Sequence, residues 1–355
     1  MKKRVLILGA FVGLLALICA LLLHWNKRNT QFQGRTVAEW SIAAYNGDTN
    51  APVALRKLSP RGVALLIVLT DYREPVWRQK MRALVAKSPG FIRARYGPKL
   101  AAPDVGLVRI AAVRSLGIIG PDARASIPTL TQIMETIPNQ MRTEAATALG
   151  RIGKDSLQAL TQAVSNVDMA IACAALAGLG EVGRDAAPAI PAMLPFMTNV
   201  DGNTRLLAGH SLTRIGPAGL LAVIDMQADG DERLQQAAAE YLRRELSSIR
   251  PPVLVLRELA HDKSPEICCR AMKALGQMRP ATAHNVRMIM AGLKDSAPAV
   301  RLDAVRALEN IGGRAAVAVP ELKALLQDTD SSVRAAAQSA IQRIESLAHT
   351  KPTSP

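Results

Sequence analysis

Apolar residues recur along most of the chain with a regular long period. A leucine at position 116, near the end of an apolar run, has counterparts downstream at nearly equal spacings, and most of the steps are identical in length. These eight marker positions are Leu116, Leu149, Leu179, Leu212, Leu242, Leu275, Leu308 and Ile341. Positions eight and four residues before each marker and three after it are mostly apolar, which is one stripe of a 3.6-residue helix. The pattern predicts a tandem array of helices, each with one buried face.

The segments between the marker helices carry turn signals. In three units a glycine after the helix is followed eight residues later by a proline: Gly120 and Pro128, Gly183 and Pro191, Gly312 and Pro320. Glycine can end a helix with a positive φ, and proline fits the first turn of the next helix, where its missing N–H is not needed. Each unit is therefore predicted to be helix, turn, helix.

The pattern continues upstream with less regularity. Residues 77–84 match it about one repeat length before Leu116, and a more degenerate unit runs through Ala54, Leu55 and Leu58. Thr36 and Glu39 have the spacing of a capping box. We expect an N-terminal cap with degenerate repeats over residues 36–100, regular repeats over 101–348, and a disordered tail over 349–355.

The N-terminus has the pattern of a membrane anchor. After a basic stretch at residues 1–4, positions 5–23 are uncharged and mostly aliphatic, about the length that crosses a bilayer as a helix. We predict a single-pass signal anchor at 5–25 and a juxtamembrane linker at 26–35. The alternatives are a cleaved signal peptide, disfavoured by the long apolar run, and a lipoprotein modified at Cys19, disfavoured by the large residues before it. The predicted location is a bacterial inner membrane, with the repeats on the periplasmic or extracellular side.

The repeat strings resemble the HEAT family, in particular the short HEAT-like repeats of the phycobilisome lyase type. The matching strings run over residues 145–153, 179–183 and 300–312. Residues 34–40 are similar to a segment that precedes the repeats in some membrane-anchored bacterial HEAT proteins. The resemblance implies an all-α fold, a right-handed α-solenoid of about nine or ten helix pairs, with the marker helices on the concave side. It implies little about activity, because one fold serves many partners.

Composition and charge add two points. Aromatic residues are 3% of the chain, which favours close-packed small side chains in an all-α core, and the net charge is +15. That charge favours anionic partners without choosing among them. Four cysteines, two of them adjacent, do not form a disulfide framework.

The sequence offers no catalytic constellation. None of the five histidines forms a metal-binding pair, and there is no equivalent of the His-Glu pairs of deoxyhypusine hydroxylase, a HEAT-repeat enzyme. Ser211 imitates a hydrolase nucleophile elbow, but the predicted helix around Leu212 places it away from any strand-to-helix turn. We expect no enzyme, no cofactor and no metal site.

Basic residues concentrate two positions before and two after the markers, opposite the buried stripe. We call these residues the basic row: Arg114, Arg151, His210, Arg214, Arg244, Lys273, Arg306 and Arg343. Only Glu181 and Glu240 are acidic at the equivalent positions. Arginines seven residues before the markers, such as Arg301, are instead predicted to link consecutive repeats structurally.

The predicted function is a membrane-tethered scaffold that presents the basic row to a protein or peptide of acidic character. A plain solvated face remains an equal interpretation of the row. The alternatives are a solenoid that binds anionic lipid or nucleic acid, the latter disfavoured by an outward-facing anchor, and lastly a lyase- or hydroxylase-like HEAT enzyme.

Overall fold

The marker positions lie inside helices and are buried, as the sequence predicts. The computed structural model describes residues 31–58, 61–87, 90–101, 104–138, 140–226, 231–245, 255–256, 258–277 and 281–349. All eight marker side chains are at most 9% exposed. Their helices are α7 (Val105–Ile119), α9 (Gln140–Ile152), α11 (Met169–Val182), α13 (Gly202–Ile215), α15 (Glu232–Glu245), α17 (Pro265–Gln277), α19 (Pro298–Ile311) and α21 (Ser331–His349).

The connections between these helices repeat as well. Three of them begin with a 3₁₀ segment at the predicted glycine: η2 (Gly120–Ser126), η4 (Gly183–Ala189) and η7 (Gly312–Ala318). The glycines have φ of 76°, 72° and 72°, which favours glycine over residues that carry a Cβ. The predicted prolines are the second residues of α8 (Ile127–Thr136), α12 (Ile190–Met193) and α20 (Val319–Ala324). The helix–turn–helix prediction is confirmed in these units.

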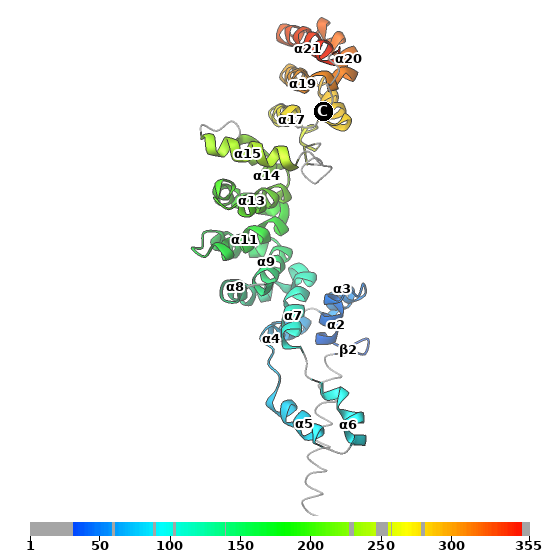
Figure 1. The fold of residues 1–355 in the computed structure, drawn as a ribbon, viewed down its shortest axis with the longest axis vertical. Helices are drawn as coiled ribbons and strands as arrows, with labels where there is room; N and C mark the ends of the chain where they lie inside the picture. The colour runs from blue at the N-terminus through cyan, green and yellow to red at the C-terminus, as the bar shows by residue number, and fades with distance from the viewer. Residues whose placement is uncertain are drawn as a thin grey trace, which may run out of the picture. The chain divides into compact units, whose positions relative to one another are not determined.

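The chain divides into two compact units, residues 1–160 and 161–355. In the first unit, α7 packs against α9 and is also contacted by α2 (Val37–Tyr45), α3 (Ala51–Leu58) and α4 (Arg61–Thr70) (Figure 1). Three short helices upstream therefore pack against the first marker helix. Also in this unit are α5 (Val76–Ala86), α6 (Gly90–Tyr96), η1 (Pro98–Leu100) and η3 (Lys154–Ser156).

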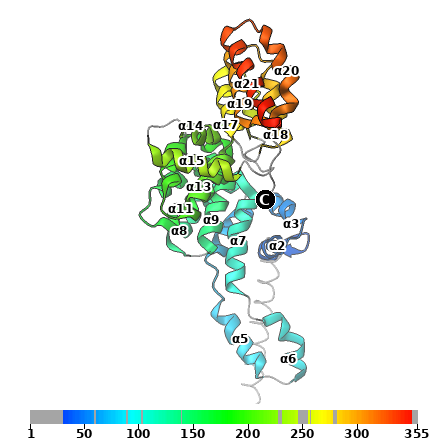
Figure 2. The ribbon, with the colours of Figure 1, turned by 45° about the horizontal axis from the view of Figure 1, so that its top comes forward.

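In the second unit the marker helices pack in sequence order. The pairs α11 and α13, α17 and α19, and α19 and α21 are in contact (Figure 2). The other elements here are η5 (Leu194–Thr198), α14 (Pro217–Asp225), α18 (Ala283–Gly292) and η8 (Leu325–Gln327), and α10 (Leu157–Val164) crosses the boundary between the units.

The capping box is confirmed in atomic detail. The backbone N–H of Glu39 donates to the Thr36 hydroxyl at 3.3 Å, and the N–H of Thr36 donates to the Glu39 carboxylate at 2.7 Å. Trp40 is buried and its indole N–H donates to the carbonyl of Phe32 at 2.8 Å. That carbonyl belongs to the one departure from an all-α fold among the described residues. It is a two-stranded antiparallel hairpin of β1 (Gln31–Phe32) and β2 (Arg35–Thr36), with Gln31 opposite Thr36 and Phe32 opposite Arg35.

One upstream expectation is not met. The match over residues 77–84 places Leu84 at a marker position, yet Leu84 is 64% exposed and only Val85 of its helix, α5, is buried. The physical reason is that α5 contacts α6 and η1, two short elements that cannot cover its apolar side.

The predicted anchor at 5–25 and the predicted tail, apart from the helical residue His349, lie outside the described residues. Among the helices that the structure describes, none has both the length and the apolar composition needed to cross a membrane.

Candidate interaction surface

Very close contact between neighbouring marker helices sets the geometry of the basic row. In three pairs of neighbouring marker helices, the residue after one marker lies against the residue before the next, and both residues are small. A Cβ added to Gly117 would lie 2.9 Å from the Cα of Ala148, and one added to Gly276 would lie 2.7 Å from the Cα of Ala307. Because the backbones approach so closely, side chains two positions from the markers reach the next helix.

Arg114 of the basic row is held by such a contact. Its guanidinium forms an ion pair with Glu144 of α9, with Nε 3.1 Å from the carboxylate, and stacks over the ring of Tyr45 at 4.6 Å. The hydrogen bond to Glu144 raises the pKa of Arg114. Arg114 therefore joins α7 to α9 and to the cap helix α2.

Lys273 occupies the same repeat position as Arg114 and meets an equivalent acid. Its Nζ lies 3.7 Å from the carboxylate of Asp303 in α19, and Arg306 approaches the other oxygen of that carboxylate at 3.9 Å. Lys273 and Arg306 are 64% and 63% exposed, whereas Asp303 is 10% exposed. Two exposed cations thus share one nearly buried carboxylate.

Arg214 is paired in a third way. Its guanidinium lies 2.8 Å from the carboxylate of Glu181 and donates from Nε to the carbonyl of Gly180 at 3.3 Å. Glu181 is one of the two acidic residues that the sequence places at positions equivalent to the basic row. A cation of α13 is therefore paired with an acid of the adjacent helix, α11.

The remaining members of the basic row differ in their surroundings. His210 is half-buried and meets the ring of Tyr241 edge-on, with centroids 5.9 Å apart. Arg151 and Arg343 are exposed. Arg244 lies in α15, and the prediction for its side chain falls outside the described residues. Arg114 and Arg151 belong to the first unit and the others to the second.

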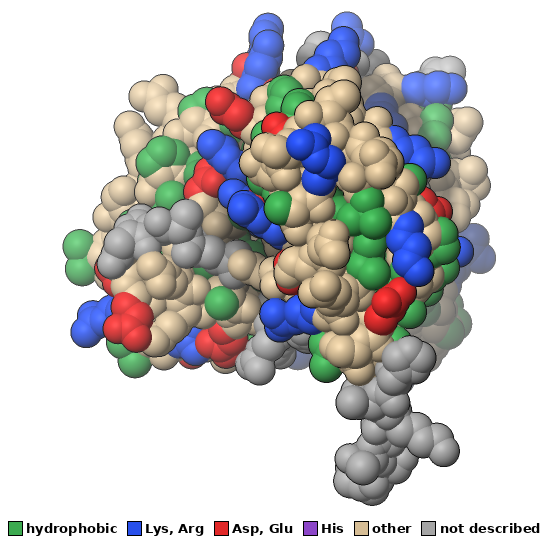
Figure 3. All heavy atoms as spheres, turned by 90° about the horizontal axis from the view of Figure 1, so that it is seen from above, with side chains coloured by type: hydrophobic (Ala, Val, Ile, Leu, Met, Phe, Trp, Pro, Cys, Tyr) green, Lys and Arg blue, Asp and Glu red, His purple; other side chains and the backbone are tan. Residues whose placement is uncertain are grey.

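Sequence reasoning missed the acids that pair with the row. Glu144 and Asp303 both lie five residues before a marker, outside the positions two residues from each marker that define the basic row. A search of every helical position within reach of the row would have found them. On the face drawn in Figure 3, Lys and Arg side chains lie interspersed with Asp and Glu side chains.

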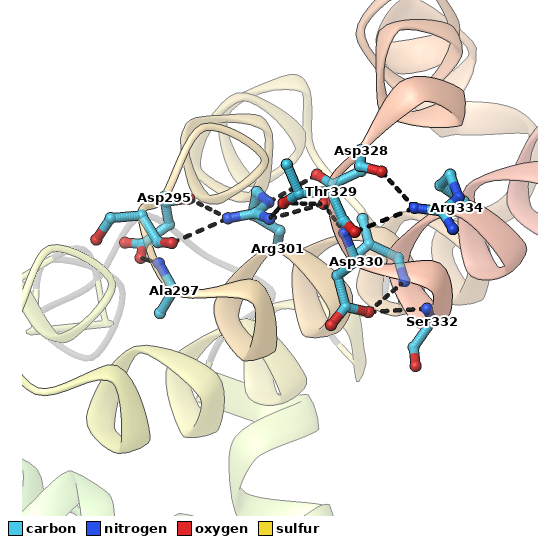
Figure 4. Close-up of polar contacts among 10 residues, drawn as sticks. Asp295, Ala297, Arg301, Asp328, Thr329, Asp330, Ser332 and Arg334 are labelled. Atoms are coloured by element: carbon cyan, nitrogen blue, oxygen red, sulfur yellow. Dashed lines mark hydrogen bonds and ion pairs between the residues drawn. The ribbon is translucent and has the colours of Figure 1, made fainter.

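The arginines seven residues before the markers have the structural role predicted for them (Figure 4). Arg301 donates from Nη1 to the carbonyls of Asp295 and Ser296, at 2.9 and 3.0 Å. It also binds the carboxylate of Asp328 with two bonds of 2.8 and 2.7 Å. Arg334 donates to the carbonyl of Asp328 at 2.6 Å in the same way. The bonds to carbonyls join each loop to the helix that follows it, and the Arg301–Asp328 bonds join α19 to the loop of the next repeat.

Potential chemical sites are few in the described part of the chain. Ser211 is buried inside α13 against Gly180, which agrees with its helical prediction. Burial raises the pKa of the Cys269 thiol to about 11, with a further contribution from Asp303. Cys173, Cys268 and Cys269 are all free thiols. No group of three or more metal-ligating side chains occurs among the described residues.

A pocket of about 210 Å³ lies between α13 and α15. Met197, Leu206 and Tyr241 form its apolar lining, and Arg205 and Glu240 provide its charged groups. Tyr241 stands directly before a marker, where the other repeats carry small residues, and its hydroxyl is 3.1 Å from that of Thr213. Tyr241 is the one large residue at this repeat position, and it lines the pocket.

Comparisons with solved structures find similar chains at low sequence identity. Among solved structures, an engineered protein is similar at 20% identity over 87% of this chain and 94% of its own, with a TM-score of 0.33. The archaeal HEAT-like repeats protein from Thermococcus onnurineus NA1 is similar at 13% identity, over 62% of this chain and 98% of its own, with a TM-score of 0.27. Human deoxyhypusine hydroxylase is similar at 18% identity, over 76% of this chain and 97% of its own, also at 0.27. We draw no conclusion from likenesses at TM-scores of this size.

The sequence comparison is more direct. No curated protein matches the chain. Residues 253–342 match the family model described as HEAT repeats, a stretch that includes α17 and α19. Residues 253–342 therefore contain HEAT repeats, as the resemblance of the string at 300–312 predicts.

Proposed function

We propose that the chain is a protein-interaction scaffold that binds acidic segments of a partner through exposed cations of the basic row. The observation that carries the proposal is the group formed by Lys273, Arg306 and Asp303. The carboxylate is nearly buried between α17 and α19, while both cations project into solvent. The group therefore presents net positive charge on a rigid helical surface, where an acidic side chain can pair with it.

The contacts between repeats divide the basic row into two kinds of residue. Arg114 and Arg214 are engaged with Glu144 and Glu181, so removing them would disturb the packing of neighbouring helices. Arg306 and Lys273 approach their shared acid only at 3.9 and 3.7 Å and keep most of their surface in water. The second kind of residue is the one we assign to partner binding.

We further propose that the scaffold is tethered to a bacterial inner membrane by residues 5–25, with the repeats on the periplasmic or extracellular side. The support is the uninterrupted apolar run at positions 5–23 behind a basic N-terminus. A tether of this kind would raise the local concentration of the basic surface at the bilayer. The proposal assigns the chain no catalytic step, and any turnover that one substitution abolishes would contradict it.

The test is proximity labelling from a tag fused after Pro355, compared between wild type and Lys273→Gln/Arg306→Gln. Glutamine removes both charges without placing a second acid beside Asp303. The matched control is Arg287→Gln/Arg314→Gln, which removes two exposed positive charges from α18 and η7 in the same unit. We expect a discrete set of labelled proteins that disappears in the first variant and persists in the control. Equal labelling in all three proteins would refute the assignment of these cations.

A further inference from the structure

Large apolar side chains gather on the surface of the α5–α6 hairpin (residues 76–96). Six of them are between 43% and 76% exposed: Val76, Trp77, Met81, Leu84, Phe91 and Tyr96. Only Val85 of the described side chains in the two helices is buried. Soluble surfaces rarely carry such a concentration of apolar residues without a binding role.

The apolar residues of α5 form one stripe with lysines beside it. At about 100° per residue, Trp77, Met81 and Leu84 fall within about 60° of one another around the helix axis. Lys80 and Lys87 follow within about another 60° on one side. Both lysines are exposed, and neither forms an ion pair with any described residue. The helix thus has an apolar stripe bordered by long cationic side chains.

The hairpin is also strongly basic. From position 75 to position 103 the sequence holds seven Lys or Arg residues and no Asp or Glu. Only Arg82 among the described basic side chains of the two helices is paired, with Glu74 of the preceding loop, at 2.6 and 2.9 Å. The other cations of the hairpin have no acidic partner in the described part of the chain, so the surface around the apolar stripe keeps its positive charge.

The hairpin has little stability of its own. Its helices have 11 and 7 residues, lengths at which isolated helices are marginal in water. Their packing partners are each other and η1, and one buried valine is a small core. A surface that covers Trp77, Met81 and Leu84 would therefore stabilise the helices as well as bind them.

We propose that the α5–α6 hairpin lies on the surface of an anionic lipid bilayer. Three features favour a bilayer over an acidic protein or a nucleic acid. The apolar stripe needs an apolar phase, the lysines beside it can extend to headgroups while their stems stay in contact with acyl chains, and Trp and Tyr rings suit the interface. Anionic headgroups complement a segment of seven cations and no acid. The site is separate from Lys273 and Arg306 and depends on neither the protein partner nor the predicted anchor.

The experiment measures hydrogen exchange of the full chain mixed with vesicles of phosphatidylcholine alone or of phosphatidylcholine with phosphatidylglycerol. We expect amides of residues 76–96 to exchange about tenfold or more slowly on the anionic vesicles. Each lysine near an anionic surface contributes about fivefold in affinity, so Lys80→Gln/Lys87→Gln should remove most of that slowing. Trp77→Ser/Leu84→Ser should also remove the slowing, because the apolar contact of α5 with the acyl chains is lost.

Matched controls separate the hairpin from general surface effects. Lys263→Gln/Lys294→Gln removes the same charge from exposed positions of the second unit, and Val167→Ser/Val200→Ser removes two exposed apolar side chains there. Both controls should keep the wild-type slowing. Equal exchange on the two kinds of vesicle in wild type would overturn the proposal without reference to any variant. Slowing by short RNA or by polyglutamate, with none on vesicles, would also overturn it and assign the hairpin another class of ligand.

Discussion

The close contact between α17 and α19 makes a sharp prediction for Gly276→Ala. In a helix, alanine in place of glycine is favourable by about 1 kcal/mol. Against this, the new Cβ would lie 2.7, 2.8 and 3.2 Å from the Cα, Cβ and carbonyl oxygen of Ala307. These atoms are backbone or directly attached to it, so the two helices must separate, and overpacking of this kind costs about 1–3 kcal/mol. The steric term exceeds the propensity term, and we expect a net destabilisation of about 1 kcal/mol.

The same calculation gives a different result at Gly180. There the new Cβ would lie 3.1 Å from the Cα of Ser211 and 3.3 Å from its Cβ and Oγ, so a shift of a few tenths of an ångström relieves the contact. The two terms then nearly cancel, and Gly180→Ala should change stability little. Gly202→Ala is the control, because its nearest atom is 3.6 Å away at the end of the Arg205 side chain.

Urea denaturation of the full chain, followed by circular dichroism, measures the free energy of unfolding of each variant. Hydrogen exchange then shows whether the loss in Gly276→Ala is located in α17 and α19, as local opening in a repeat array requires. A Gly276→Ala protein that gains the full helix-propensity term would refute the reasoning, since it would mean that the two helices are not in backbone contact.

Three further predictions concern charged and thiol groups. Arg301→Ala should lower the free energy of unfolding, measured by urea denaturation, by about 3 kcal/mol. The side chains of Arg301 and Asp328 are only 11% and 5% exposed, so the substitution leaves a buried carboxylate without its ion-pair partner. A loss below about 1 kcal/mol would contradict this, because it is the value expected of a solvent-exposed ion pair. Arg301 holds the pKa of Asp328 at about 2, below its ordinary value of 3.8, so this carboxylate contributes stability above about pH 4 that is lost as the pH falls through about 2. Melting temperatures between pH 5 and pH 2 should therefore fall more steeply in wild type than in Asp328→Asn, and parallel curves would contradict the assignment. The Cys269 thiol, with a pKa of about 11, should react with iodoacetamide at pH 8 far more slowly than an unperturbed cysteine and faster in Asp303→Asn, as peptide mass spectrometry would report.

In the basic row, the exposure of the cations could be predicted from the sequence, but their ion-pair partners could not. Its positions relative to the markers are fixed by helical periodicity, and the exposure of Arg306 and Lys273 followed from that alone. Whether a given cation is free or paired depends on the neighbouring helix. Arg114 meets Glu144, from a position that the sequence comparison had not considered, and Tyr45, which lies in the cap helix α2 far upstream in the chain.

The segment at residues 77–84 shows that a repeat pattern in the sequence does not by itself predict burial. Its sequence matches the repeat pattern, but a matching pattern buries a residue only where a neighbour is present to cover it. Leu84 has no such neighbour among the described elements and stays exposed. The same absence of cover is what makes α5 and α6 a candidate binding surface.

The repeat period, the helices that carry the markers, the glycine and proline turns and the capping box at Thr36 could all be predicted from the sequence. These features depend on side-chain periodicity and on local backbone preferences, which are properties of short stretches of chain. The pairing of the cations, the burial of the acids and the exposure of the apolar stripe on α5 became known only from the folded structure. Those outcomes depend on how closely helices of different repeats approach one another, and a single stretch of sequence does not contain that distance.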